Sequence, residues 1–144
     1  MKKREILLVS HGELAHGMRH ALTMLVGNAE HVDSYGLMPG EMPETIAQSL
    51  EAQIHAEPDT RFFILADLLC GSVSNAVTRL SLLDNVTVIN GMNLPLVIGL
   101  YFSEPELSGE ELETLIQQAR AGICMADLQL IAPEDAAEEE DLIL

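Results

Sequence analysis

Short apolar runs alternate along the chain with longer stretches of helical spacing. Residues 5–9 and 62–66 are apolar apart from Glu5, and such short runs predict strands that are buried on both faces of a sheet. Residues 31–35 and 86–90 are predicted to form two further strands. The chain is therefore expected to build a sheet of at least four strands.

The segments between and after these strands predict five helices. In the first two, apolar residues recur three and four positions apart, which indicates one buried face. Ser72 or Ser74 is expected to cap the third helix, and Ser108 with Glu111 forms a capping box before the last. The helices are expected at residues 14–26, at 43–55, from 72 or 74 onward, at 94–101 and at 109–121.

This order of elements predicts the fold class. Strands that alternate with helices form an α/β, doubly wound sheet, here of four mostly parallel strands. Weak alternation over residues 125–131 predicts a C-terminal edge strand in addition. We expect a single domain over residues 1–132. Residues 133–144 contain six acids and no base, and we expect this tail to be disordered.

The chain is strongly acidic, with 23 acidic against 7 basic residues and a net charge of −16. Binding to nucleic acid requires clustered cations, so no nucleic-acid partner is expected, whereas a basic protein partner fits this charge. Every apolar run falls far short of the ~20 residues of a membrane span. The run 6–9 is also too short for a signal peptide, so we expect a cytoplasmic protein.

Chemistry in doubly wound sheets gathers just beyond the carboxyl ends of the strands. Four loops qualify, and His11 and Asp67 are the pair among them with the clearest chemistry. A carboxylate that accepts the proton of one imidazole nitrogen leaves the other nitrogen as a nucleophile. Gly71 and Ser72 at a helix start would bind phosphoryl oxygens, and Gly12 would allow a close backbone approach to His11.

Other candidate sites have weaker support. His16 and His20 have the spacing of a two-histidine metal site but lack the usual intervening glutamate, so we expect solvated helix residues and no metal. Cys70 is a conceivable nucleophile, but we expect Cys70 and Cys124 to be buried, reduced thiols. The chain has neither a dinucleotide nor a Walker motif, and no cofactor is expected.

Four motifs occur in an order that suggests a family. Each is weak alone, but together they span about residues 5–125. They are Val9-Ser10-His11-Gly12, Pro39-Gly40-Glu41 followed by Glu44-Thr45, Asp67-Leu68-Leu69-Cys70-Gly71-Ser72 with Asn75, and Val88-Ile89-Asn90-Gly91-Met92-Asn93-Leu94-Pro95. With them the chain resembles the IIA domain of the mannose-class sugar phosphotransferase system (PTS), which serves mannose, fructose, sorbose and N-acetylgalactosamine.

The resemblance implies a function as a phosphoryl carrier during sugar uptake. His11 would accept a phosphoryl group from the phosphocarrier HPr and pass it to a IIB domain, with Asp67 orienting it. Gly71, Ser72 and Gly12 would lie against the phosphoryl group. The resemblance also implies a homodimer in which the last, antiparallel strand reaches into the partner's sheet, and here this edge strand would be about residues 125–131. Association with the membrane components IIC and IID would be indirect.

The phosphate loop departs from the family pattern, because Cys70 and Val73 replace residues that are often glycine and proline.

Three alternative functions stay open. The first is a regulatory module in which phosphorylation of His11 is a signal. The second is a phosphocarrier of the dihydroxyacetone kinase type. The third is a small hydrolase that uses His11 and Asp67 with Cys70.

Overall fold

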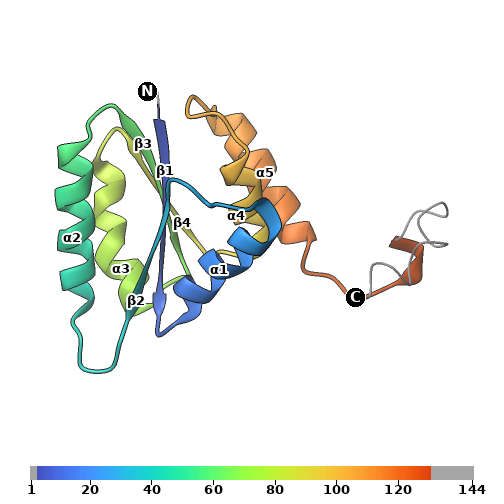
Figure 1. The fold of residues 1–144 in the computed structure, drawn as a ribbon, viewed down its shortest axis with the longest axis horizontal. Helices are drawn as coiled ribbons and strands as arrows, with labels where there is room; N and C mark the ends of the chain where they lie inside the picture. The colour runs from blue at the N-terminus through green and yellow to red at the C-terminus, as the bar shows by residue number, and fades with distance from the viewer. Residues whose placement is uncertain (1–2, 131–144) are drawn as a thin grey trace.

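Four parallel strands form the centre of the computed structural model, which describes residues 3–130 (Figure 1). Their order across the sheet is β2-β1-β3-β4, so the first and third strands of the chain are neighbours. In the register, Val9 lies opposite Ala66 and His11 lies opposite Leu37. The strands are β1 (Lys3–His11), β2 (Val32–Leu37), β3 (Thr60–Ala66) and β4 (Val86–Asn90).

Helices cover both faces of this sheet, as Figure 1 shows. Side chains along a strand point alternately to the two faces. Thus Ile6 and Leu8 of β1 pack with α1, α4 and α5, whereas Leu7 and Val9 pack with α2 and α3. The helices are α1 (Leu14–Val26), α2 (Pro43–Ala56), α3 (Ser72–Thr78), α4 (Leu94–Tyr101) and α5 (Gly109–Ala121), with short 3-10 turns η1 (Arg79–Leu82) and η2 (Leu128–Leu130).

The predicted four-stranded α/β sheet and its five helices are confirmed, with α1, β4 and α4 at their predicted bounds. Strand β2 begins one residue later than expected and runs two residues further, to Leu37. At the start of α5, Ser108 accepts the backbone N–H of Glu111, as the capping box requires. Helix α3 begins at Ser72, but the predicted serine cap is wrong, because Gly71 is the N-cap and no side chain caps the helix.

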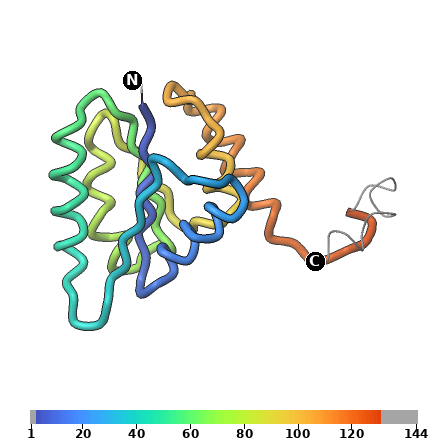
Figure 2. The backbone as a smooth tube through the Cα atoms, viewed as in Figure 1, coloured from blue at the N-terminus to red at the C-terminus, as the bar shows by residue number. Residues whose placement is uncertain are grey.

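The expected edge strand at residues 125–131 is not formed within the described residues of the single chain. Residues 124–127 have no regular structure, and Leu128–Leu130 forms a 3-10 turn. Figure 2 shows that the chain after α5 leads away from the sheet. A strand needs a neighbouring strand to accept and donate its hydrogen bonds, and among residues 3–130 this segment meets none. The expected tail, residues 133–144, lies outside the described residues.

The burial expected for the two cysteines is also wrong. Cys70 and Cys124 are both exposed. Cys70 lies in a tight loop with a φ of 62°, and Cys124 lies in the segment beyond α5, so neither has a core to pack into. Over residues 3–130, no helix is long and apolar enough to cross a membrane.

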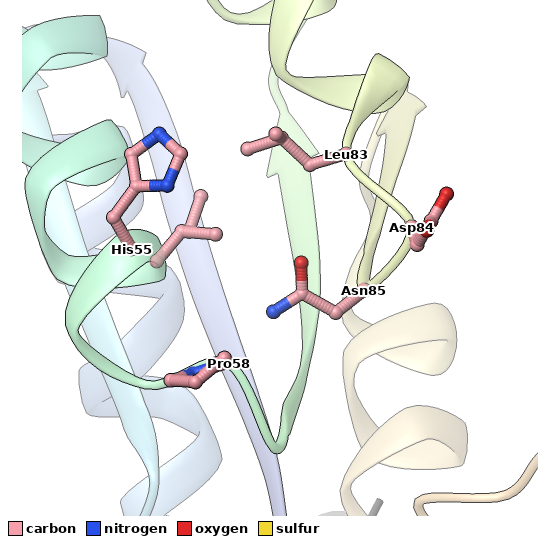
Figure 3. A pocket seen from close by; sticks show the side chains of 6 residues that line it. His55, Pro58, Leu83, Asp84 and Asn85 are labelled. Atoms are coloured by element: carbon pink, nitrogen blue, oxygen red, sulfur yellow. The ribbon is translucent and has the colours of Figure 1, made fainter.

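A hollow of about 170 Å³ lies at the amino-terminal edge of the sheet, between the end of α2 and the loop before β4 (Figure 3). The side chains of His55, Leu83 and Asn85 face it, whereas Asp84 points away. The polar side chains of Asn85 and His55 that line the hollow already interact with the protein. Asn85 donates to the Thr60 carbonyl, and His55 pairs with Glu51 on the same helix. This edge is opposite to the one at which the predicted reactive residues lie.

Candidate active site at the carboxyl edge of the sheet

His11 and Asp67 meet because β1 and β3 are neighbours that end at the same edge. His11 is the last residue of β1, and Asp67 directly follows β3. The Asp67 Oδ2 atom accepts the backbone N–H of His11 at 2.9 Å and lies 2.9 Å from the ring Nδ1 atom. Asp67 is 8% exposed and His11 45%. The carboxylate is therefore a fixed, buried anchor, and the imidazole is accessible to a partner.

These contacts define the chemical state of the imidazole. An ionised carboxylate only accepts hydrogen bonds, so Nδ1 carries a hydrogen atom and donates it in a hydrogen bond to Asp67. The lone pair is then on Nε2, which lies 3.0 Å from the Ser72 hydroxyl oxygen. Since neutral Nε2 accepts, the Ser72 hydroxyl donates to it. His11 thus presents a nucleophilic nitrogen to solvent.

The loop that carries Ser72 fits closely around the imidazole. Gly71 is buried, and its N–H donates to the Leu68 carbonyl at 3.3 Å in a tight turn. A Cβ atom on Gly71 would lie 3.2 Å from Cε1 of His11 and 3.4 Å from a methyl group of Leu68. A side chain at residue 71 would therefore require the ring of His11 or the loop to shift by a few tenths of an ångström. Cys70, one residue earlier, has a φ of 62°, a left-handed backbone conformation that favours glycine.

Gly12 has a different role from the one expected. Its φ of 57° favours glycine, but a Cβ atom there would meet nothing within 4 Å. The close approach occurs at Gly36 of β2, where a Cβ atom would collide with the Gly12 carbonyl oxygen. The Gly12 N–H donates to the Leu37 carbonyl at 2.8 Å. Sequence reasoning missed Gly36, because its partner lies 24 residues away in the chain.

Two buried serines, for which the sequence analysis did not predict these contacts, hold the site's loops. Ser10 is fully buried, and its Oγ atom accepts the N–H of Ala15 at 2.8 Å, which fixes the start of α1 after His11. Ser74 donates to the Asn90 side chain at 2.6 Å, which ties the start of α3 to the end of β4. Each serine lies near a predicted helix start, and this position was the only sign in the sequence of a structural role. The group that each hydroxyl contacts could not be predicted from the sequence.

The competing residues do not form a second centre. His16 is half-buried and its Nδ1 atom lies 2.7 Å from the Ser34 hydroxyl, so it is not the solvated residue expected, whereas His20 is exposed. Within residues 3–130, no group of three or more histidine, cysteine or acidic residues is arranged to hold a metal. The side-chain oxygen next to the His11 Nε2 atom is that of Ser72. The group that contacts this nitrogen is therefore the Ser72 hydroxyl and not the Cys70 thiol.

Comparison with known families agrees with this geometry. The model of the EIIA-man family, described as the PTS system fructose IIA component, matches residues 5–117. The chain belongs to the EIIA-man family. As a PTS IIA component of the mannose and sorbose class, it belongs to a phosphotransferase family that acts in sugar uptake.

Individual members of the EIIA-man family support the assignment. The sorbose-specific EIIA component of Klebsiella pneumoniae is 32% identical over 134 residues, which cover 92% of this chain and 96% of the relative. The mannose-specific EIIAB component of Escherichia coli strain K12 is 30% identical over 122 residues, 82% of this chain but only 38% of that longer protein.

Solved structures of EIIA proteins have the same architecture. The IIA protein associated with the fucose utilization operon of Streptococcus pneumoniae has a TM-score of 0.76 and 31% identity, covering 89% of this chain and 96% of its own. The mannose/sorbose-specific IIA subunit of Enterococcus faecalis also has a TM-score of 0.76, covering 88% of this chain and 96% of its own. Its identity is 23%, so that likeness concerns the fold.

Proposed function

We propose that the Nε2 atom of His11 accepts a phosphoryl group from HPr and passes it to a IIB domain. The observation that carries this proposal is the bond between Nδ1 of His11 and Asp67. It leaves Nε2 as the free nucleophile on a ring that is 45% exposed, where a donor protein can reach it. No cofactor is needed, since the phosphoryl group moves from one protein histidine to another.

Asp67 acts on both sides of the transfer. Before transfer, it selects the tautomer whose lone pair is on Nε2. After transfer, the phosphorylated imidazole holds a positive charge on the ring, which the adjacent carboxylate stabilises. The second bond, from the backbone N–H of His11 to the same Oδ2 atom, keeps the carboxylate in place while the charge changes.

The phosphoryl group would lie in the loop between β3 and α3. The Ser72 hydroxyl, 3.0 Å from Nε2, would turn to donate to a phosphoryl oxygen once the lone pair is used. Gly71 and Gly12, on either side of His11, leave space for the group because they have no side chains. No side chain caps α3, so the N–H groups of its first turn have no competing acceptor of that kind.

Large apolar side chains surround this edge and support docking of partner proteins. Leu14, Met42, Leu68 and Leu69 are between 53% and 68% exposed, and each lies in or beside a loop at the carboxyl edge. Apolar patches of this kind favour protein partners. A net charge of −16 favours partners that are basic around their own active histidine or cysteine. We place this exchange in the cytoplasm, with only indirect contact to IIC and IID.

We further propose that residues 1–132 form one phosphocarrier domain that pairs into a homodimer. The segment after α5 supports pairing, because its large apolar side chains have no cover in a single chain. These residues, Ile123, Met125, Leu128 and Leu130, are between 68% and 90% exposed. Sedimentation at micromolar concentration would give a dimer mass, and a monomer would contradict this part of the proposal.

The experiment that tests the function is a reconstituted relay. The chain is incubated with phosphoenolpyruvate, enzyme I and HPr, and then with a IIB domain. We expect one acid-labile phosphoryl group on the wild-type chain, none on His11→Ala, and onward transfer to IIB. His55→Ala is the matched control, because His55 is exposed at the opposite edge of the sheet and should leave both steps unchanged. Acceptance without onward transfer would indicate a regulatory role instead.

A further inference from the structure

Three side chains at the site form a continuous acid–base–hydroxyl relay. Asp67 Oδ2 lies 2.9 Å from Nδ1 of His11, and Nε2 of the same ring lies 3.0 Å from the Ser72 hydroxyl oxygen. A phosphoryl carrier needs the first contact, whereas the second directs a serine hydroxyl at the lone pair that phosphorus must take. This is the order of groups that activates serine in acyl-transfer enzymes, where geometry and not sequence position defines the triad.

We propose that the unphosphorylated chain has a second activity, acyl transfer from small activated carboxylic esters, with Ser72 as the nucleophile. The Ser72 oxygen forms a bond to the carbonyl carbon while its proton moves to Nε2 of His11. The bond to the leaving alcohol or phenol then breaks, and that group departs with the proton from Nε2. Water then gives a proton to the same Nε2 and attacks the carbonyl carbon of the acyl-serine. The bond from that carbon to the Ser72 oxygen breaks, and Nε2 returns the proton to this oxygen, which releases the carboxylic acid and free Ser72.

The position of Ser72 suits a nucleophile. Ser72 is exposed and is the first residue of α3, after a turn closed by the bond from the Gly71 N–H to the Leu68 carbonyl. The turn also holds Gly71 against the imidazole, where a Cβ atom would lie 3.2 Å from Cε1 of His11. Leu68 lies next to this turn and is 55% exposed, so a short apolar acyl group has a surface to contact.

The same geometry makes the two activities mutually exclusive. A phosphoryl group on Nε2 would occupy the lone pair that must take the Ser72 proton. Phosphorylation of His11 therefore switches acyl transfer off, and an acyl group on Ser72 blocks the approach to Nε2. This consequence rests on the proposed function, whereas the triad itself does not.

The test uses a fluorophosphonate probe, which reacts with activated serines by forming a bond from oxygen to phosphorus and releasing fluoride. The full chain is treated with the probe, digested and mapped by mass spectrometry. We expect labelling at Ser72 in the wild type, and at least tenfold less labelling in His11→Gln and Ser72→Ala. Ser81→Ala is the matched control, because Ser81 is an exposed serine whose hydroxyl donates to the Thr78 carbonyl. The Ser81→Ala control should keep full labelling.

Hydrolysis of 4-nitrophenyl acetate gives a second readout, with an expected loss of at least tenfold in Ser72→Ala. Equal rates in Ser72→Ala and wild type would show direct attack by the imidazole and overturn the proposal. Absence of a label on wild-type Ser72 would also overturn it, and so would full labelling of a chain already phosphorylated on Nε2. Phosphoryl acceptance is measured on the same samples. An unlabelled chain that accepts phosphate therefore removes only this inference, and a labelled chain that accepts none removes only the relay.

Discussion

The Nδ1 atom of His11 and the Oδ2 atom of Asp67 lie 2.9 Å apart, and the same carboxylate oxygen accepts the backbone N–H of His11. One buried oxygen thus fixes both the position of the histidine on β1 and the tautomer of its ring. The double contact arises because β1 and β3 are adjacent and their carboxyl ends meet. It is the basis for the predictions that follow.

Asp67→Asn should slow phosphoryl transfer through His11 by roughly 100-fold to 10,000-fold, because an amide keeps the size of the carboxylate but not its charge. The neutral amide neither stabilises a charged ring nor selects the tautomer as strongly. The measurement is the rate of phosphorylation by HPr in rapid-quench experiments. Asp84→Asn is the control, since Asp84 is exposed at the opposite edge and points away from the hollow in Figure 3. Rates within twofold of wild type for Asp67→Asn would contradict the assigned role.

Gly71→Ala should reduce phosphorylation of His11 by about tenfold or more, because small misplacements of reacting groups are costly. Its added methyl group would lie 3.2 Å from Cε1 of His11, and the ring or the loop must move. The φ of Gly71 is −77°, so alanine causes no backbone strain, and the shortest contact of its methyl group is with the ring. Gly109→Ala is the matched control, since a Cβ atom there meets nothing within 4 Å. An unchanged rate in Gly71→Ala would mean that the loop does not hold the imidazole.

Gly36→Ala should lower the free energy of unfolding by about 1–3 kcal/mol, because its methyl group collides with the carbonyl oxygen of Gly12. Backbone atoms on both sides leave little freedom to relax. Urea denaturation followed by circular dichroism measures the change. In the same assay, Gly17→Ala on the exposed side of α1 should stabilise the chain by up to about 1 kcal/mol, since nothing lies within 4 Å of its Cβ position. Equal stabilities for the two variants would contradict the close approach.

Cys70→Gly should be more stable than Cys70→Ala by about 1 kcal/mol, since Cys70 has a φ of 62° and only glycine adopts that region without strain. Both variants remove the exposed thiol, so their difference isolates the backbone conformation. Thermal unfolding of the two proteins side by side gives the comparison. If the alanine variant were the more stable, the left-handed conformation at residue 70 would be wrong.

The sequence predicted those parts of the fold and site that depend on local pattern. Apolar runs and helical spacing gave four strands and five helices, and the ends of β1 and β3 indicated His11 and Asp67. The contact between Gly36 and Gly12 was not predictable, because it joins strand β2 to the turn after β1 through space without a local motif. The donation from the Ser72 hydroxyl to Nε2 depends on the turn at Cys70, which the sequence alone did not define.

The edge strand expected at residues 125–131 would pair with a partner's sheet in a dimer, and one chain by itself does not form it. The burial expected for Cys124 is wrong, because it assumed that the segment after α5 returns to the sheet of its own chain. In the structure this segment leads away from it (Figure 1), and Met125 is 90% exposed. Alternation of apolar residues indicates that a segment has two faces. It does not indicate which surface covers the apolar one.

The central claim concerns one atom, Nε2 of His11, and it is tested by locating phosphorus on the ring. The chain is labelled with ¹⁵N-histidine and phosphorylated by phosphoenolpyruvate, enzyme I and HPr, and phosphorus–nitrogen couplings are recorded by NMR. The bond from Nδ1 to Asp67 predicts a single phosphohistidine, on residue 11, with phosphorus bonded to Nε2. Phosphorus on Nδ1, or on any other residue, would contradict the account.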